Sequence, residues 1–361
     1  MAIEIRELRD ESEAKELRRI GRRSFHPGFF LIIPKPKWAF GAFEDGKCLG
    51  GVVLKKIAGT GLIEFIFIAK GARGRSLGKQ LTGRALEAFR EQGLETALAS
   101  VRDDNTASWN LFAGRGFHAC SLRELIRRFG LGRALALSLG SSHAIAFGFD
   151  LWVGSVEAAL SPDPPDPDVT QSVPGGGFSS LLGHTFLNLL PVTAAAWQFN
   201  EPYAYMAIGL LLLIVVRLLF GYLGTLPFFR PARLRMARGG YIIEVPVQVY
   251  GSVFFYPAHW HPRLARWREP DYRTGLGVSA LLSVLGIMAV LGTSSLLLAS
   301  GELQSAIAVG TAEVIAHVGK PILILEVQPL FEAWSGPRIR RWNRWVYLAL
   351  LAGAVVLLVF A

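Results

Sequence analysis

The feature that most constrains this chain is its division into a charged first part and an apolar second part. Residues 131–361 contain several apolar stretches of about 20 residues, the length that a helix needs to cross a membrane. Lysine follows the same division, because Lys320 is the only lysine after Lys79. A mean hydropathy of +0.36 agrees with a membrane-embedded part. We therefore expect a separate domain over residues 1–128 and a multi-pass membrane domain over residues 129–361.

The net charge of +10 comes from arginines that flank apolar segments. They cluster at 123–133, 230–238, 263–273 and 338–344. Such clusters are typical of the cytoplasmic flanks of membrane helices, so the lipid bilayer is an expected partner and nucleic acid is not. The first 23 residues contain no apolar run, which predicts no cleaved signal peptide. We expect a multi-pass protein of the cell membrane whose N-terminal domain is cytosolic.

Residues 1–122 alternate between strand and helix patterns in the order β-α-β-β-β-α-β-α-β, which predicts a mixed α/β sheet. Asp45–Gly46 predicts a hairpin between two β-rich runs. Gly93 is expected to end one helix, and Asn105 is expected to begin another. Cys48 and Cys120 are the only cysteines, and we interpret them as structural residues in a reducing compartment.

The segment IAKGARGRSLGKQL, Ile68–Leu81, joins an apolar strand pattern to a helical pattern. The first backbone N–H groups of a helix have no partner within it, and the helix dipole adds positive potential, so such a junction binds phosphate oxygens. Gly74 and Gly78 permit close approach of a ligand, while Arg73, Arg75 and Lys79 add charge. The alternative is a surface turn with solvated basic residues.

Two segments of residues 1–122 resemble the GNAT family of acyl-CoA-dependent N-acetyltransferases. In RGRSLGK, Arg73 and Gly78 match the family's pyrophosphate loop, and Ser76 replaces its usual first glycine. In NTASWNLFAGRGF, five residues match, and Phe112 stands where many members have tyrosine. The five are Asn105, Ser108, Leu111, Gly116 and Phe117. The resemblance implies that acetyl-CoA is bound by Ile68, Arg73, Gly74, Arg75, Ser76, Leu77, Gly78, Lys79, Asn105 and Phe112.

The resemblance also implies direct transfer of an acetyl group from acetyl-CoA to an amine, whose identity the sequence does not reveal. The amine must be neutral to attack, so a general base or a water relay assists. Glu64, on the strand before the loop, is the candidate base; the alternative is a strand carboxylate that faces solvent. Asn105 fits a helix cap, a cofactor contact or both. Phe112 cannot protonate the leaving thiolate, so water or another group must do so.

The remainder of the chain contains six candidate membrane segments, at 131–155, 177–199, 203–229, 275–299, 303–330 and 344–361. If all six crossed, the arginine-rich stretches 230–273 and 336–344 would lie outside, against the positive-inside rule. We therefore predict that either 131–155 or 177–199 is re-entrant or interfacial. Both are interrupted by polar residues.

The C-terminal third weakly resembles the end of archaeal-type site-2 protease membrane domains. Pro329–Leu330 and Trp342–Asn343 match, but Phe331–Glu332 replaces the metal-binding aspartate, and the chain has no His-Glu-x-x-His motif. We therefore predict no metal site.

Several ionisable residues of the apolar part carry more than one interpretation. Glu313 and His317 share a helix face and fit a polar network better than zinc. Arg217 needs a buried partner, which Glu313 or Glu326 could supply. His259 and His261 fit an aromatic and imidazole belt better than a metal site.

Three functions remain open from the sequence. The first is a membrane-anchored N-acetyltransferase that uses acetyl-CoA at the cytosolic face, with an inactive protease-like bundle as anchor. The second is a regulator that binds acetyl-CoA without catalysis. The third, which the missing motif disfavours, is an atypical intramembrane metalloprotease.

Overall fold

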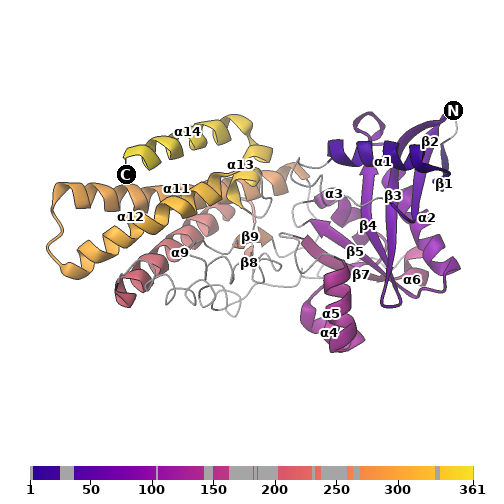
Figure 1. The fold of residues 1–361 in the computed structure, drawn as a ribbon, viewed down its shortest axis with the longest axis horizontal. Helices are drawn as coiled ribbons and strands as arrows, with labels where there is room; N and C mark the ends of the chain where they lie inside the picture. The colour runs from indigo at the N-terminus through magenta and orange to yellow at the C-terminus, as the bar shows by residue number, and fades with distance from the viewer. Residues whose placement is uncertain are drawn as a thin grey trace. The chain divides into compact units, whose positions relative to one another are not determined.

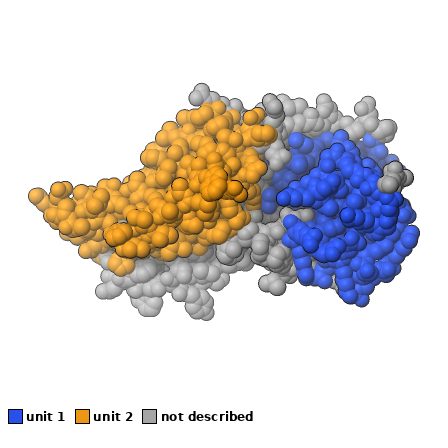
Figure 2. Space-filling view, turned by 90° about the horizontal axis from the view of Figure 1, so that it is seen from above, with its two compact units in different colours: residues 1–144, 149–174, 264–266 blue, residues 145–148, 175–263, 267–361 orange. Residues whose placement is uncertain are grey.

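A computed structural model of the chain describes residues 3–24, 36–102, 105–141, 149–161, 182, 185, 202–229, 232–236, 258–262, 269–329 and 334–360. The chain divides into two compact units, which Figure 2 colours separately. Unit 1 is Met1–Ala144, Phe149–Pro174 and Leu264–Arg266, and unit 2 holds the rest. Unit 1 therefore extends beyond the boundary that we expected at residue 128.

Unit 1 is built on a seven-stranded sheet in the order β1-β2-β3-β4-β5-β7-β6 (Figure 1). Only the β4–β5 pair is parallel. Its elements are β1 Glu4–Glu7, α1 Glu11–Ser24, β2 Ala39–Glu44, β3 Lys47–Ile57, β4 Thr60–Ile68, the 3-10 turn η2 Lys70–Ala72, α2 Leu77–Glu91, β5 Thr96–Arg102, α3 Thr106–Ala113, β6 His118–Cys120, α4 Leu122–Phe129, α5 Leu131–Gly140, β7 Phe149–Ser155 and α6 Val156–Leu160. The predicted mixed α/β fold and its element order through β6 are confirmed.

Helices cover both faces of this sheet, as adjacent residues of β4 show. A Cβ at Gly61 would meet the ring of Phe89 on α2. Leu62 instead packs in a buried cluster with Leu125 of α4 and Leu137 of α5. Successive side chains of a strand point to opposite faces, so α2 lies on one face and the α4–α5 pair lies on the other.

Local turn chemistry sets the predicted boundaries of several elements. Asp45 and Gly46 have φ of 50° and 76°, and they join β2 to β3 in a two-residue turn of the type that matches strand twist. Gly93 has φ of 65° just after α2. The Asn105 side chain accepts a hydrogen bond from the backbone N–H of Ser108 and begins α3. All three predictions are confirmed. Cys48 and Cys120 are free and buried.

The described residues of the candidate membrane segment 131–155 belong instead to unit 1. Its first part is the short helix α5, and its last part is β7. β7 pairs with β5 from Phe149 opposite Arg102 to Ser155 opposite Thr96, and its other edge pairs with β6. A strand covered on both faces has a continuous apolar sequence, as a membrane helix does. Composition alone therefore assigned β7 to a candidate membrane segment.

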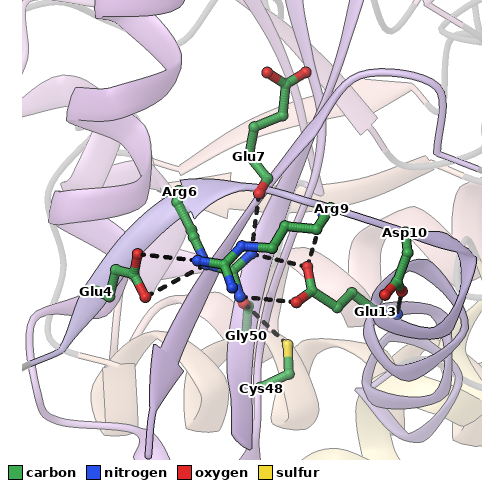
Figure 3. A network of polar contacts seen from close by, with 8 residues as sticks. All are labelled: Glu4, Arg6, Glu7, Arg9, Asp10, Glu13, Cys48 and Gly50. Atoms are coloured by element: carbon green, nitrogen blue, oxygen red, sulfur yellow. Dashed lines mark hydrogen bonds and ion pairs between the residues drawn. The ribbon is translucent and has the colours of Figure 1, made fainter. Parts of the chain in front are cut away.

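An ionic network ties α1 to β1 at the edge of the sheet (Figure 3). The Arg6 guanidinium donates two hydrogen bonds, of 2.9 and 2.7 Å, to the carboxylate of Glu13. The backbone N–H of Arg9 donates to the same carboxylate over 2.8 Å. These hydrogen bonds, first those from Arg6, hold the pKa of Glu13 down at about 2. Arg6 also lies over the Phe43 ring, with its guanidinium carbon 4.0 Å from the ring centroid.

The described part of unit 2 is helical apart from the antiparallel pair of strands β8 and β9 (Figure 1). Its described elements are α9 Tyr203–Thr225, β8 Ala232–Met236, β9 Ala258–Pro262, α11 Glu269–Ser300, α12 Ala306–Val327, α13 Ser335–Trp342 and α14 Arg344–Phe360. Tyr203–Thr225, Pro270–Ser300 and Ala306–Val327 are long and apolar enough to cross a membrane. Unit 2 is therefore the expected helical region. Segment 177–199 lies outside the described residues except for 182 and 185.

Candidate functional site

The loop between β4 and α2 is held at both ends by buried residues. Ala72 is 2% exposed on one side and Leu77 is 2% exposed on the other. Between them, residues 73–76 are exposed. The backbone N–H of Ala69 donates to Leu49 O over 2.8 Å, which fixes the start of the loop to β3. The loop is therefore a short, anchored bridge from the end of the strand to the start of the helix.

Two residues of this loop have left-handed backbone conformations. Gly74 has φ of 83°, and no heavy atom lies within 4 Å of the position that a Cβ would take. Ser76 has φ of 58°, a conformation that costs a residue with a Cβ about 1–2 kcal/mol. This cost gives a physical reason for glycine at the position of Ser76 in the resembling loops.

The N-terminus of α2 offers backbone donors. The first helical hydrogen bond runs from Gln80 N–H to Ser76 O over 3.2 Å, and the Ser76 side chain makes no capping hydrogen bond. The amides of Leu77, Gly78 and Lys79 therefore precede the hydrogen-bonded turns, at the positive end of the helix dipole. A Cβ at Gly78 would meet only Leu111, at 3.7 Å, so the backbone there is accessible.

The basic residues of the loop divide into two kinds. Arg73 and Lys79 are exposed. Arg75 instead pairs with Glu44 of β2 through both guanidinium Nη atoms, one of them at 3.0 Å. That pair raises the pKa of Arg75, and the Arg75 hydrogen bond lowers the pKa of Glu44. The three basic residues are equivalent in the sequence pattern, and the contact with Glu44 distinguishes Arg75 from Arg73 and Lys79.

The ladder between β4 and β5 ends well before either strand does. It joins only Gly61–Ile63 to Ala97–Ala99, although β4 continues to Ile68 and β5 to Arg102. On its other edge β4 stays paired with β3 up to Ile68. The β5-facing edge of β4 beyond Ile63 is therefore outside the ladder, and it leads directly to the loop. An extended ligand can add to such an edge through backbone hydrogen bonds.

Glu64 is the first residue of β4 beyond this ladder. The β3–β4 register shifts between Val53 and Leu54, which are opposite Phe65 and Ile63, so Glu64 is the extra residue of a bulge. Its side chain is half-buried. Burial raises the pKa of Glu64, and the charge of Lys55 opposes that rise. A carboxylate with a raised pKa is a better base near neutral pH.

The structure places the two remaining predicted site residues in α3. The Asn105 amide is occupied at both ends, because its Nδ2 also donates to Ser108 Oγ over 2.8 Å. Phe112 is 3% exposed and packs against Phe117, with ring centroids 5.3 Å apart. Asn105 is thus a helix cap, and Phe112 is a core residue.

Arg115 is a polar residue of this region that sequence reasoning missed. Its Nη2 donates to the backbone O of Lys79 over 2.8 Å, and its Nη1 donates to Ala159 O over 3.1 Å. Burial lowers the pKa of Arg115. It ties the first turn of α2 to α6, and no local sequence signal marks a contact over such a separation.

A strand, a glycine-containing loop and an uncapped helix N-terminus beside a split sheet together make up a candidate anion-binding site in unit 1. Residues 3–117 match the model of the acetyltransferase (GNAT) family. The chain therefore carries a GNAT acetyltransferase domain at its N-terminus. This match covers the first part of the chain and none of unit 2.

One curated protein is similar to part of the chain. The N-alpha-acetyltransferase MAK3 of Arabidopsis thaliana is 31% identical over 92 residues, which are 24% of this chain and 48% of that protein. The chain thus spans about half the length of this curated relative.

Solved structures with similarity to the chain include two named enzymes. The ribosomal-protein-S18-alanine N-acetyltransferase of Escherichia coli is 14% identical, with a TM-score of 0.32, over 43% of this chain and 94% of that one. The PaiA N-acetyltransferase of Thermoplasma acidophilum, in complex with coenzyme A, is 15% identical, with a TM-score of 0.32, over 43% and 99%.

Two ionisable residues of unit 2, Arg217 of α9 and Glu326 of α12, form a buried ion pair. Arg217 Nε donates to Glu326 Oε1 over 2.6 Å, and the two side chains are 1% and 0% exposed. Arg217 Nη1 also donates to Ala258 O of β9, and Glu326 Oε2 accepts from the backbone N–H of Ser335. The prediction that Glu313 or Glu326 pairs with Arg217 is confirmed for Glu326.

The other polar candidates in unit 2 do not join that contact. Glu313 and His317 are exposed, which corrects the expectation that they belong to a buried network. His259 and His261 are buried, and His261 Nδ1 is 3.0 Å from the Tyr272 hydroxyl. Among the described residues there is no group of three or more His, Cys, Asp or Glu side chains placed to hold a metal. Leu330 and Phe331–Glu332, part of the protease resemblance, lie outside the described residues, and no comparison supports that resemblance.

Proposed function

We propose that the protein is a membrane-bound N-acetyltransferase that transfers the acetyl group of acetyl-CoA to an amine at the cytosolic face. The observation that carries this proposal is the uncapped N-terminus of α2, with Gly78 accessible and Arg73 and Lys79 exposed beside it. Its position in a domain that matches the GNAT family gives the anion site a specific ligand class.

Acetyl-CoA would bind with its pyrophosphate on the loop from Arg73 to Lys79. The backbone amides of Leu77, Gly78 and Lys79 would donate to phosphate oxygens, as at other helix N-termini. The extended pantetheine arm would follow the edge of β4 from Ile68 toward Glu64, where the ladder to β5 has ended. Arg75 would join the phosphates only by exchanging its contact with Glu44.

The reaction forms a C–N bond between the amine and the acetyl carbonyl and breaks the C–S bond of the thioester. The amine nitrogen must lose a proton, and the half-buried Glu64 carboxylate with its raised pKa would accept it directly or through water. The leaving thiolate takes a proton from solvent, because Phe112 has no proton to give and lies in the core. Backbone N–H groups along β4 would stabilise the oxyanion.

The position of β7 supports the proposed orientation in the membrane. Residues 149–155 belong to the sheet, so segment 131–155 does not cross a bilayer. If segment 177–199 and α9 both cross, the arginine-rich stretch 230–273 returns to the side that holds unit 1. The positive-inside rule places that side in the cytosol, where acetyl-CoA is available.

One observation favours a second function, that of an acetyl-CoA-binding regulator without catalysis. The family's usual tyrosine proton donor is replaced by Phe112, which is 3% exposed. A binder and an enzyme share the phosphate site and differ only in turnover with an amine.

Isothermal titration of the purified full chain with acetyl-CoA tests the site that both functions share. Gly78→Val should weaken binding about tenfold or more, or about 1.4 kcal/mol, because its side chain would occupy the approach to the helix amides. Gly132→Val is the matched control, because Gly132 is also the second residue of its helix and has no atom near its Cβ position. Equal affinity in both variants, or no binding by the unmodified chain, would refute the proposed site.

A further inference from the structure

The connection between β6 and β7 is much longer than the sheet requires. The two strands are antiparallel neighbours, with Cys120 opposite Leu151 and His118 opposite Val153. Antiparallel neighbours can be joined by a two-residue turn. Residues 121–148 intervene instead, and they include both α4 and α5. We call these two helices the insert.

The insert has one face in the core of unit 1. Leu125 of α4 is 1% exposed, and Ala134 and Leu137 of α5 are fully buried. They pack with Leu62 of β4 and Leu151 of β7 in one cluster. This packing fixes the orientation of both helices on the sheet.

Another side of α5, next to its buried face, carries a row of exposed leucines. Leu131, Leu135 and Leu139 are 58%, 47% and 58% exposed. They are four residues apart, so they form one stripe along the helix. Exposed large apolar side chains in a continuous stripe are unfavourable in water and mark a contact with a partner or a membrane.

The charged residues of the insert are mainly positive. Residues 122–140 contain four arginines, at 123, 127, 128 and 133, against one acid, Glu124. Arg123, Arg127 and Arg128 are exposed. Glu124 is engaged with His118, whose Nε2 is 2.9 Å from Glu124 Oε1. The leucine row of α5 and the exposed arginines of the neighbouring helix α4 give the insert both apolar and positively charged side chains, which are complementary to the apolar layer and anionic headgroups of a bilayer surface.

We propose that the insert is a membrane-surface contact of the acetyltransferase domain. Leu131, Leu135 and Leu139 enter the interfacial layer of an anionic leaflet, and Arg127 and Arg128 bind its headgroups. The commitment to a bilayer rests on this charge complementarity and on the three helices of membrane-spanning length in the same chain. A contact of this kind would hold unit 1 at the leaflet surface by its own residues, in addition to the covalent connection to unit 2.

The test uses the full chain in lipid nanodiscs, with Cys48→Ala and Cys120→Ala as background. A fluorophore is attached at Leu135→Cys, and a control fluorophore at Glu87→Cys, which is exposed on α2 at the opposite face of the sheet. Brominated lipids should quench the probe at 135 and leave the probe at 87 unquenched. Quenching at 135 should be stronger with phosphatidylglycerol present than in phosphatidylcholine alone, and it should weaken at high salt.

A second variant keeps the test independent of any change at the leucine row. Arg127→Gln with Arg128→Gln should abolish the difference between the two lipid mixtures at the position-135 probe. The proposal is overturned if probes 135 and 87 are equally unquenched in both mixtures. It is also overturned if the position-135 probe is shielded in lipid-free detergent in proportion to protein concentration, which would indicate a protein contact.

Discussion

Arg217 and Glu326 are 109 positions apart in the sequence and form an ion pair in which both side chains are buried. The pair connects α9 to α12, and through Ala258 and Ser335 it also reaches β9 and the start of α13. The ion pair and its two hydrogen bonds to the backbone therefore connect four elements of unit 2. A buried pair of this kind is strongly sensitive to the loss of either partner.

Glu326→Gln should destabilise the helical bundle by about 3–5 kcal/mol, because Arg217 would be left buried without its counter-charge. Arg217→Met combined with Glu326→Leu should recover most of that loss. Glu313→Gln, at an exposed position of the same helix, serves as the control and should change little. The measurement is thermal unfolding in detergent as a double-mutant cycle, and purely additive losses would exclude coupling between the two residues.

Labelling of single cysteines in intact cells, in a background that lacks Cys48 and Cys120, tests the topology. Ser172→Cys and Ser252→Cys should resist a membrane-impermeant reagent, because both are predicted to lie on the cytosolic side. Ser305→Cys, exposed between α11 and α12, should react. Reaction at Ser252 would disprove the orientation. Reaction at Ser172 alone would require a crossing before residue 172 and would contradict the position of β7 in the sheet of unit 1.

The stability of unit 1 should fall in acid because of Glu13. Its folded pKa of about 2 lies below the usual value near 4.5, so its stabilising contribution is complete above about pH 4.5 and is lost as the pH falls toward 2. Glu13→Gln should lower the unfolding midpoint at neutral pH and flatten this acid dependence. Glu16→Gln, on the same helix beside the mostly exposed Arg19, should preserve it. Identical acid profiles for Glu13→Gln and the unmodified protein would contradict the assignment.

Glu64→Gln should reduce amine acetylation by about 100-fold or more while acetyl-CoA affinity stays nearly constant, because a general base acts on turnover. The rate should rise with pH as the Glu64 carboxylate ionises. Lys55 lowers the pKa of Glu64, so Lys55→Met should move this acid limb to higher pH. If Glu64→Gln shows the same rise of rate with pH as the unmodified protein, Glu64 is not the general base.

The sequence predicted features that depend on neighbours in the chain and missed those that depend on distant ones. The Asp45–Gly46 hairpin and the Asn105 cap follow from local backbone chemistry, and both are present. β7 was missed because its apolar run is equally suited to a lipid environment and to a sheet covered on both faces. The distinction depends on β5 and β6, which lie far away in sequence.

Charged side chains show the same limit. Glu313 and Glu326 are equally possible partners for Arg217 in the sequence, and only the packing of α12 against α9 selects Glu326. Arg75 was counted as a free loop charge because Glu44 is 31 residues away. The periodicity of a helix or strand predicts which residues share a face. Tertiary packing determines which residues that face contacts.

The most direct test of the account is amine-dependent release of CoA thiol by the full chain. Purified protein in nanodiscs is given acetyl-CoA with small amines, amino lipids or peptides with free N-termini, and acetylated product is identified by mass spectrometry. We predict thiol release that requires one of these amines and that falls in Gly78→Val but not in Gly132→Val. Tight acetyl-CoA binding with no thiol release and no acetylated product from any amine class would contradict the proposed acetyltransferase activity. It would favour the second function, that of a regulator that binds acetyl-CoA without catalysis.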